Sequence, residues 1–265
     1  MAWSTDGVTW TGIDGMASSF AGYGISGIAY GGGKFVAVGD YGHMAYSSNG
    51  ETWTGIDGTA SSFGSSGIYD IAWGGGKFVA VGNNGQIAYS TDGVAWTGID
   101  GTGSSFGTSV IMGIAYSGGK FVAAGADGKM AWSTDGATWT SIDATASTFG
   151  VFWIHSITYG GGKFVAVGDY GHMAYSSNGV TWTGIDGTES TFGTSQINSI
   201  TYGGGKFVAG GYNGTMAWST DGVAWTGIDG MGSVFGTSTI LGIAYGGGKF
   251  VAGGDGGKMA WHEYP

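Results

Sequence analysis

A 43-residue repeat constrains what this chain can fold into more than any other feature. The lysine of a Gly-Gly-Lys-Phe motif recurs every 43 residues, at Lys34, Lys77, Lys120, Lys163, Lys206 and Lys249. Six periods account for 258 of the 265 residues. A repeat of this length is typical of one supersecondary unit that buries its apolar faces only against neighbouring units. We therefore expect a single domain over residues 1–265, where length alone would suggest two.

Each repeat reads as four short strands joined by tight turns. In the first repeat they are Gly27–Tyr30, Lys34–Gly39, His43–Ser47 and Glu51–Ile56. These runs are rich in aromatic and β-branched residues, and glycines bound them too closely for helices. The turns carry Asp or Asn next to Gly, which suits hairpins because their central residues need positive φ. Four strands per repeat match a β-propeller blade, and six blades fall within the usual range of four to eight.

The predicted fold is therefore all-β, a six-bladed β-propeller with four antiparallel strands per 43-residue blade. The blades are expected at residues 27–56, 70–99, 113–142, 156–185, 199–228, and 242–261 together with 8–13. Met259-Ala-Trp261 repeats Met1-Ala-Trp3, so the chain overlaps itself by one partial strand. We expect Val8–Ile13 to supply the fourth strand of the last blade and to close the ring without a free sheet edge.

The third turn of each repeat carries the motif Ser-x-Asp/Asn-Gly-x-Thr/Ala-Trp. It occurs at Ser4–Trp10, Ser47–Trp53, Ser90–Trp96, Ser133–Trp139, Ser176–Trp182 and Ser219–Trp225. We expect the Asp or Asn to cap backbone N–H groups, the Gly to supply positive φ and the Trp to pack between blades. The motif resembles the Asp-box of sialidase-like β-propellers, with one residue fewer between Asp and Trp than the commonest form. The resemblance implies a propeller and a folding role for the box, on the face opposite that family's active site.

The residue types present argue against catalysis. Sialidases clamp the substrate carboxylate with an arginine triad, but all eight basic residues here are Lys, which lacks the bidentate guanidinium fork. Other glycosidases need two carboxylates at a fixed separation. The glutamates are Glu51, Glu189 and Glu263, and most aspartates stand at repeated positions, as structural roles predict. No cluster has metal-ligand spacing. We expect neither enzyme activity, nor a cofactor, nor a metal site.

Charge and hydropathy exclude two further classes of partner. The formal net charge is −10, so the surface repels nucleic-acid phosphates instead of neutralising them. No apolar run approaches the roughly 20 residues that span a bilayer, so we expect no membrane insertion. The first ten residues lack a basic and an apolar signal region, which predicts no signal peptide and leaves the compartment open. The chain is expected to be a monomer.

Propeller connectivity places the inter-blade segment and the second turn of each repeat on one face, which we expect to bind ligand. The segment repeats an Asp and a Phe, and the second turns of the first and fourth repeats carry Tyr and His. The candidate ligand-binding residues are Asp14, Asp57, Asp100, Asp143, Asp186, Asp229, Phe20, Phe63, Phe106, Phe149, Phe192, Phe235, Tyr41, His43, Tyr170 and His172. Two alternatives remain open. The repeated Asp and Phe also suit a loop anchor, in which Asp caps the backbone and Phe fills the gap between blades. Variation between blades at this face reflects either diversified binding or unconstrained loop tips.

Two classes of function fit these features. The first is a non-enzymatic, multivalent carbohydrate-binding protein, a lectin, whose weak glycan sites on repeated loops gain affinity through multivalency. This hypothesis rests on analogy with repeat propeller lectins, since no specific lectin motif is present. The alternative is a structural or protein-binding propeller scaffold, which an engineered or recently amplified repeat would also resemble. A glycoside hydrolase has the least support.

Overall fold

The computed structural model describes residues 1–13, 20, 22–56, 63–143, 149–185, 191–228 and 234–263. These residues form β-strands and short 3₁₀ turns, and no α-helix occurs within them. They divide into two compact units, residues 1–4 with 10–142 and residues 5–9 with 143–265. A single domain over residues 1–265 stays a prediction.

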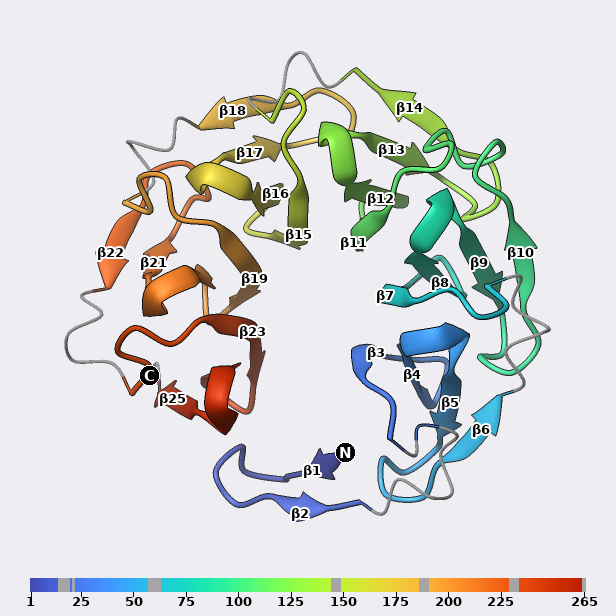
Figure 1. Ribbon diagram of the computed structural model, residues 1–265, viewed down its shortest axis with the longest axis horizontal. Coiled ribbons are helices and arrows are strands. Elements are labelled where there is room, and N and C mark those ends of the chain that lie inside the picture. The colour runs from blue at the N-terminus through green and yellow to red at the C-terminus, as the bar shows by residue number, and fades with distance from the viewer. Residues whose placement is uncertain are drawn as a thin grey trace. The chain divides into compact units, whose positions relative to one another are not determined.

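The first unit contains three four-stranded antiparallel sheets, blades 1 to 3, in which consecutive strands are neighbours. Figure 1 shows the four strands of each blade in chain order. Blade 1 comprises β3 (Ile25–Gly31), β4 (Lys34–Gly39), β5 (Met44–Ser47) and β6 (Thr54–Ile56). Blade 2 comprises β7 (Ile68–Gly74), β8 (Lys77–Gly82), β9 (Ile87–Ser90) and β10 (Thr97–Ile99). Blade 3 comprises β11 (Ile111–Ser117), β12 (Lys120–Gly125), β13 (Met130–Ser133) and β14 (Thr140–Ile142).

The second unit repeats this pattern in blades 4 to 6. Blade 4 comprises β15 (Ile154–Gly160), β16 (Lys163–Gly168), β17 (Met173–Ser176) and β18 (Thr183–Ile185). Blade 5 comprises β19 (Ile197–Gly203), β20 (Lys206–Gly211), β21 (Met216–Ser219) and β22 (Thr226–Ile228). Blade 6 comprises β23 (Ile240–Gly246), β24 (Lys249–Gly254) and β25 (Met259–Glu263), a three-stranded sheet in the part of the chain that is described.

In blade 1 the strands match the predicted ones to within one residue except at two ends. The first strand of blade 1 begins at Ile25 instead of Gly27. Its pairing with β4 continues across a bulge between Gly27 and Ile25, so that Ile25 pairs with Gly39. The fourth strand begins only at Thr54, because the residues before it belong to the third turn. The same two features recur in the other complete blades, so they belong to the repeat.

The third turn has the capped geometry that its sequence predicts. In blade 3, Asp135 Oδ1 accepts hydrogen bonds from the N–H groups of Ala137 and Thr138 at 2.8 and 2.7 Å. Ser133 Oγ accepts one from Gly136 N at 2.8 Å, and Gly136 has a φ of 71°. The N–H of Thr138 is the largest cause that lowers the pKa of Asp135 to about 2. The ionised side chain therefore stabilises the turn at neutral pH.

In the first unit, a lysine next to the first turn reaches the third turn of the next blade. Lys34 Nζ donates to the carbonyl oxygen of Asp92 at 3.0 Å, and Lys77 Nζ donates to that of Asp135 at 2.8 Å. These bonds place the first and third turns of neighbouring blades together, as propeller connectivity predicts.

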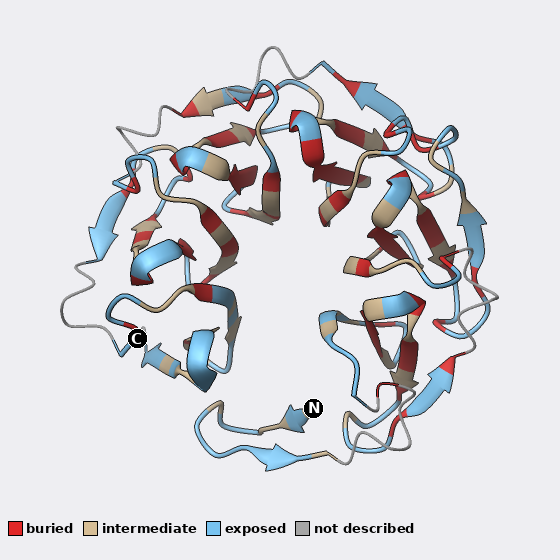
Figure 2. Cartoon of the chain, viewed as in Figure 1, coloured by how far each residue is buried: buried red, intermediate tan, exposed pale blue. Residues whose placement is uncertain are grey.

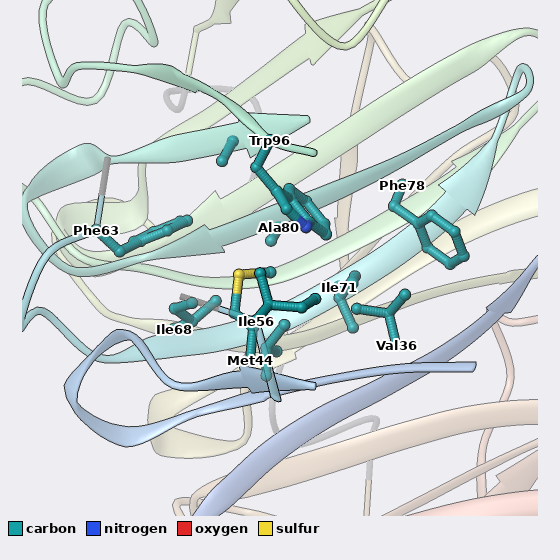
Figure 3. Close-up of a cluster of buried hydrophobic side chains, with 11 residues drawn as sticks. Val36, Met44, Ile56, Phe63, Ile68, Ile71, Phe78, Ala80 and Trp96 are labelled. Atoms are coloured by element: carbon teal, nitrogen blue, oxygen red, sulfur yellow. The ribbon is translucent and has the colours of Figure 1, made fainter. Parts of the chain in front are cut away.

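The core consists of layers between neighbouring blades. Between blades 1 and 2, Val36, Met44 and Ile56 face Phe78 and Trp96, all of them buried (Figure 3). Trp96 is 8% exposed and comes from the third turn of blade 2, so its indole fills the space between two sheets. Each fully buried side chain of this kind contributes about 1.5–3 kcal/mol.

The N-terminal hairpin differs from the prediction. Its strands β1 (Ala2–Trp3) and β2 (Thr11–Gly12) pair with each other in a separate two-stranded sheet, so Val8–Ile13 does not complete blade 6 here. The local Met-Ala-Trp sequence at residues 1–3 repeats that of β25 and offers β2 the same pairing partner a few residues away.

The turn between these two strands, residues 5–9, belongs to the second unit. Lys249 Nζ donates to the carbonyl oxygen of Asp6 at 3.3 Å, and Val251 lies beside Gly7 as Val165 lies beside Gly222. Both contacts are those that a complete blade makes with the third turn of the following blade. The N-terminal turn therefore occupies the position of a next blade after blade 6, not that of blade 6's own third turn.

No helix in the described ranges is long and apolar enough to span a membrane.

Candidate functional site

The inter-blade segment and the second turn lie together in every blade, as predicted. The second turn is a short 3₁₀ segment, such as Asp40–Gly42 in blade 1 and Asp169–Gly171 in blade 4. Its first N–H donates to the last carbonyl of the preceding segment, as Asp40 N does to Gly24 O at 3.0 Å and Asp169 N does to Trp153 O at 3.0 Å. We call the surface formed by these two segments the loop face of each blade.

Among the repeated aspartates, Asp100 behaves as a loop anchor. Asp14, Asp57, Asp186 and Asp229 lie outside the described residues. Asp143 is described and exposed. Asp100 Oδ1 accepts hydrogen bonds from Thr102 Oγ1 at 2.6 Å, from Thr102 N at 3.1 Å and from Gly103 N at 3.0 Å. The hydroxyl of Thr102 contributes most to lowering the pKa of Asp100. The anchoring alternative therefore accounts for this carboxylate without a ligand.

The six repeated phenylalanines belong to the core. Phe20, Phe63, Phe106, Phe149, Phe192 and Phe235 are 0–4% exposed. In the first unit Phe106 packs with Val81, Ile87 and Ile111 between blades 2 and 3. A ring buried to this degree presents no face to a sugar or peptide, which corrects their assignment as ligand-binding residues.

The tyrosine and histidine of each Asp-Tyr-Gly-His turn have different environments. Tyr41 and Tyr170 are 62% and 56% exposed, and both have positive φ values, 53° and 54°. His43 stacks on Tyr23 with ring centroids 4.3 Å apart, and His172 stacks on Phe152 at 5.2 Å. The histidines therefore pack the loop face from within, while the tyrosines face solvent.

The position of these histidines anchors the loop in other blades too. In blade 3 it is Lys129, whose Nζ donates to the Phe106 carbonyl oxygen at 3.0 Å and to Ser109 Oγ at 2.9 Å. In blade 6 it is Lys258, whose Nζ donates to the Phe235 carbonyl oxygen at 3.0 Å. Stacking in blades 1 and 4 and hydrogen bonding in blades 3 and 6 achieve the same result, which is to hold the inter-blade segment against the second turn.

Blade 4 carries a cluster of exposed aromatic and aliphatic side chains that the candidate residues include only in part. We call Val151, Phe152, Trp153 and Tyr170 the blade 4 patch. Val151 is 75% exposed, Tyr170 56% and Trp153 39%. Phe152 is half-buried and contacts Tyr170, with ring centroids 4.8 Å apart. Exposed aromatic side chains gathered on one loop face are typical of a protein-binding surface.

A polar pair, His155 and Asp169, lies next to the blade 4 patch. His155 Nε2 and Asp169 Oδ1 are 2.7 Å apart, and Asp169 Oδ2 accepts a hydrogen bond from Trp153 N at 3.2 Å. Asp169 therefore ties the start of β15 to the second turn that carries Tyr170. This fixes the backbone on both sides of the patch, so less conformational entropy is lost when a partner orders its side chains.

The sequence carried a signal for this patch. The three residues after each Phe-Gly read Ser-Ser-Gly in blade 2, Thr-Ser-Val in blade 3, Thr-Ser-Gln in blade 5 and Thr-Ser-Thr in blade 6, but Val-Phe-Trp in blade 4. Comparison of the repeats finds this departure, although only the structure shows that its side chains are exposed. Among the described residues, no group of three or more His, Cys, Asp or Glu side chains could hold a metal ion.

No family model and no curated protein sequence matches the chain. Its resemblance to Asp-box propellers therefore stays a prediction. Similar folds occur among solved structures, including the computationally designed Ika8 protein at 15% identity, with a TM-score of 0.65 over 91% of this chain and 71% of Ika8. YCF48 bound to a D1 peptide is 17% identical, with a TM-score of 0.67 over 92% of this chain and 78% of YCF48. YCF48 from Cyanidioschyzon merolae is 18% identical, with a TM-score of 0.65 over 91% and 84%. The chain is thus an all-β, six-bladed β-propeller, as its repeat predicts.

Proposed function

We propose that this chain is a protein-binding β-propeller that recognises its partner through the blade 4 patch. The observation that carries the proposal is the exposure of Val151, Trp153 and Tyr170 on one loop face. Tryptophan and tyrosine dominate binding energy at protein interfaces because each buries a large area at a low entropic cost. YCF48, a propeller of similar fold, has been solved with a D1 peptide bound, which supports peptide recognition as a use of this architecture.

The test exchanges the patch for the loop of a neighbouring blade. The triple variant Val151→Thr, Phe152→Ser, Trp153→Val gives blade 4 the Thr-Ser-Val sequence of blade 3. That sequence already occupies the same place in blade 3, so the variant is expected to fold. Peptides selected from a display library against the wild type should lose at least about tenfold in affinity for the variant, as expected when an interface Trp is removed.

A matched control exchanges a loop in another blade. The variant Thr194→Val, Ser195→Phe, Gln196→Trp places the patch sequence on blade 5 of wild-type protein. The selected peptides should bind this variant as they bind the wild type, because Tyr170 and the polar pair remain in blade 4. Equal binding of the peptides to the wild type and to the blade 4 variant would contradict the proposal.

Carbohydrate binding stays a second candidate, supported by Tyr41 and Tyr170. Both rings are more than half exposed and occupy the same place in two blades. Exposed aromatic faces suit the apolar faces of sugars, although the buried phenylalanines no longer contribute. A glycan array probed with the wild type and with a Tyr41→Ser, Tyr170→Ser variant tests this function. Binding that depends on both tyrosines would support it, and a blank array would leave protein binding as the function.

We also propose that the chain has no hydrolase activity. Purified protein should release no product from chromogenic glycosides, and steady release that increases with protein concentration would overturn this.

A further inference from the structure

An open groove lies between blades 5 and 6 in the second unit. It is a cavity of about 520 Å³. Its apolar walls come from both sheets: Val208, Met216 and Ile228 from blade 5, and Phe250, Ala252 and Ala260 from blade 6.

The same place is filled between the other neighbouring blades of each unit. Between blades 1 and 2 the equivalent walls are Val36, Met44, Ile56, Phe78, Ala80 and Ala88, and the indole of Trp96 lies among them (Figure 3). Trp139 fills the place between blades 2 and 3, and Trp225 fills it between blades 4 and 5. The groove between blades 5 and 6 is therefore lined by the same wall residues that surround a motif tryptophan between the other blades.

In complete blades the tryptophan arrives with the fourth strand. Trp225 precedes β22, which pairs with β21 through Met216↔Ile228, Ala217↔Gly227 and Trp218↔Thr226. In blade 6 the strand equivalent to β21 is β25. In the described sheet β25 pairs with β24 on one side only. Met259 and Trp261 of β25 are 50% and 49% exposed, and Figure 2 shows this strand as mostly exposed. Among the described residues, no further strand pairs with Met259–Trp261, and a sheet edge of this kind beside an apolar groove is a template for one more strand.

The chain itself contains a decapeptide that fits this template. Ser4–Ile13 reads Ser-Thr-Asp-Gly-Val-Thr-Trp-Thr-Gly-Ile and differs from Ser219–Ile228 only in Thr9, where blade 5 has Ala224. The tryptophans of the other five copies of the motif are 4–8% exposed, whereas Trp10 is 44% exposed. Trp10 is therefore the one motif tryptophan that lacks a buried site.

We propose that the groove of blade 6 binds Ser4–Ile13 of a second copy of this chain, in a head-to-tail assembly. Within one chain the turn at Asp6 and Gly7 lies against Lys249 and Val251, on the opposite face of blade 6 from Phe250 and Ala252. That placement leaves the groove open to another molecule. The assembly replaces the monomer expected from the sequence and is independent of the protein-binding function proposed for blade 4.

The exchange conserves the strand pairing that the donated segment already makes. In its own hairpin, Gly12 pairs with Ala2 and Thr11 with Trp3. On blade 6 the same residues pair with Ala260 and Trp261, which repeat Ala2 and Trp3 in sequence. The exchange gives up the contacts of the turn with Lys249 and Val251 of its own chain and gains burial of the Trp10 indole and of the groove walls. Each copy has one donor segment and one groove, so such a heterologous contact produces rings or open chains.

Two variants separate donor from acceptor. Trp10→Ala removes the donated indole and leaves the groove intact. Ala260→Glu places a charge on the groove wall and leaves the donor intact. Val8→Ala is the matched control, because its equivalent in blade 2, Val94, is still 38% exposed in its assembled place. In sedimentation velocity over a range of concentrations, wild type and Val8→Ala should self-associate, and each of the other variants alone should weaken association about tenfold or more.

The mixture of Trp10→Ala and Ala260→Glu should form a one-to-one heterodimer and nothing larger, since it contains one working groove and one working donor per pair. This complementation also shows that both variants are folded. A synthetic decapeptide with the sequence of residues 4–13 should bind the wild type and disperse its assemblies. A wild type that stays monomeric, or association that Trp10→Ala leaves unchanged, would overturn the proposal. So would decapeptide binding that appears only in Trp10→Ala, because the chain would then fill its own groove.

Discussion

Asp135 and Asp70 both accept hydrogen bonds from backbone N–H groups, yet their pKa values move in opposite directions. Asp135 is exposed, so hydrogen bonds from Thr138 and Ala137 dominate and lower its pKa to about 2. Asp70 is half-buried on the first strand of blade 2. Burial raises its pKa to about 6, against the lowering effect of the N–H groups of Ile114 and Ile71. At Asp70 the effect of desolvation on the pKa exceeds that of the hydrogen bonds, whereas at Asp135 the hydrogen bonds have the larger effect.

The raised pKa of Asp70 predicts a pH dependence of stability. Its pKa rises from 3.8 in the unfolded chain to about 6 in the folded protein, so ionisation costs more in the folded state. The contribution of Asp70 to the free energy of unfolding therefore falls as pH rises from about 4 to about 6, by at most about 3 kcal/mol. Asp70→Ser should remove this slope, because Ser199 at the same place in blade 5 accepts a hydrogen bond from Ile243 N at 3.0 Å. Urea unfolding of the wild type and of Asp70→Ser at several pH values between 4 and 7 measures this effect. If the free energies of unfolding of the two proteins changed with pH in parallel, the prediction would be contradicted.

The two aspartates also differ in how far the sequence reveals them. Asp135 stands in a motif that repeats six times, so its capping role is predictable from local turn chemistry. Asp70 stands where the other blades have Gly or Ser, and its second donor, Ile114 N at 2.8 Å, belongs to the next blade. A contact 44 residues away in sequence leaves no local pattern, so only the structure shows it.

The contact between blades 2 and 3 depends on a glycine at the end of the first strand of blade 2. A Cβ on Gly74, at the end of β7, would overlap the ring of Tyr116 in the next blade. A Cβ on Gly246, at the end of β23, has no heavy atom within 4 Å in the described structure. The two glycines occupy equivalent positions and neither has positive φ, so steric fit alone distinguishes them.

Gly74→Ala should therefore cost about 1–3 kcal/mol or more in the free energy of unfolding, since the Tyr116 ring must leave its packed position. Gly246→Ala should change it by less than about 1 kcal/mol. Urea unfolding monitored by tryptophan fluorescence compares the two variants directly. A similar loss of unfolding free energy in both variants would mean that an aromatic side chain packs against Gly246 in solution, as Tyr116 packs against Gly74.

At the scale of the element, the sequence predicts the four strands of a blade better than it predicts the loop face. Runs of aromatic and β-branched residues between Gly-containing turns identify β4 or β8 directly. The inter-blade Phe recurs in every blade, a pattern that fits both a ligand-binding residue and a core residue. Its burial in the structure identifies it as a core residue. Val151 and Trp153 were identifiable as departures from the repeat, but their exposure depends on how the segment lies against the second turn.

At the scale of the whole molecule, the repeat predicts six near-equal blades, and the structure makes them unequal. The second strands β8, β12, β16 and β20 each bury five of their six residues, whereas β24 buries two and β25 none. No residue of β1 or β2 is buried. A 43-residue period fixes the number of strands and their order, but the neighbours of the first and last strands follow from tertiary pairing that the repeat leaves ambiguous.

This inequality predicts an ordered pattern of amide hydrogen exchange. Protection should be greatest in β8, β12, β16 and β20, because these strands open only with a large part of the protein. It should be lowest in β1, β2 and β25, whose hydrogen bonds are covered by few apolar side chains. Exchange measured by mass spectrometry at low protein concentration tests this order. Protection of β25 that equals that of β9 at every concentration would contradict it. A rise in β25 protection as concentration increases, absent from Trp10→Ala, would instead mark a fourth strand added by another copy.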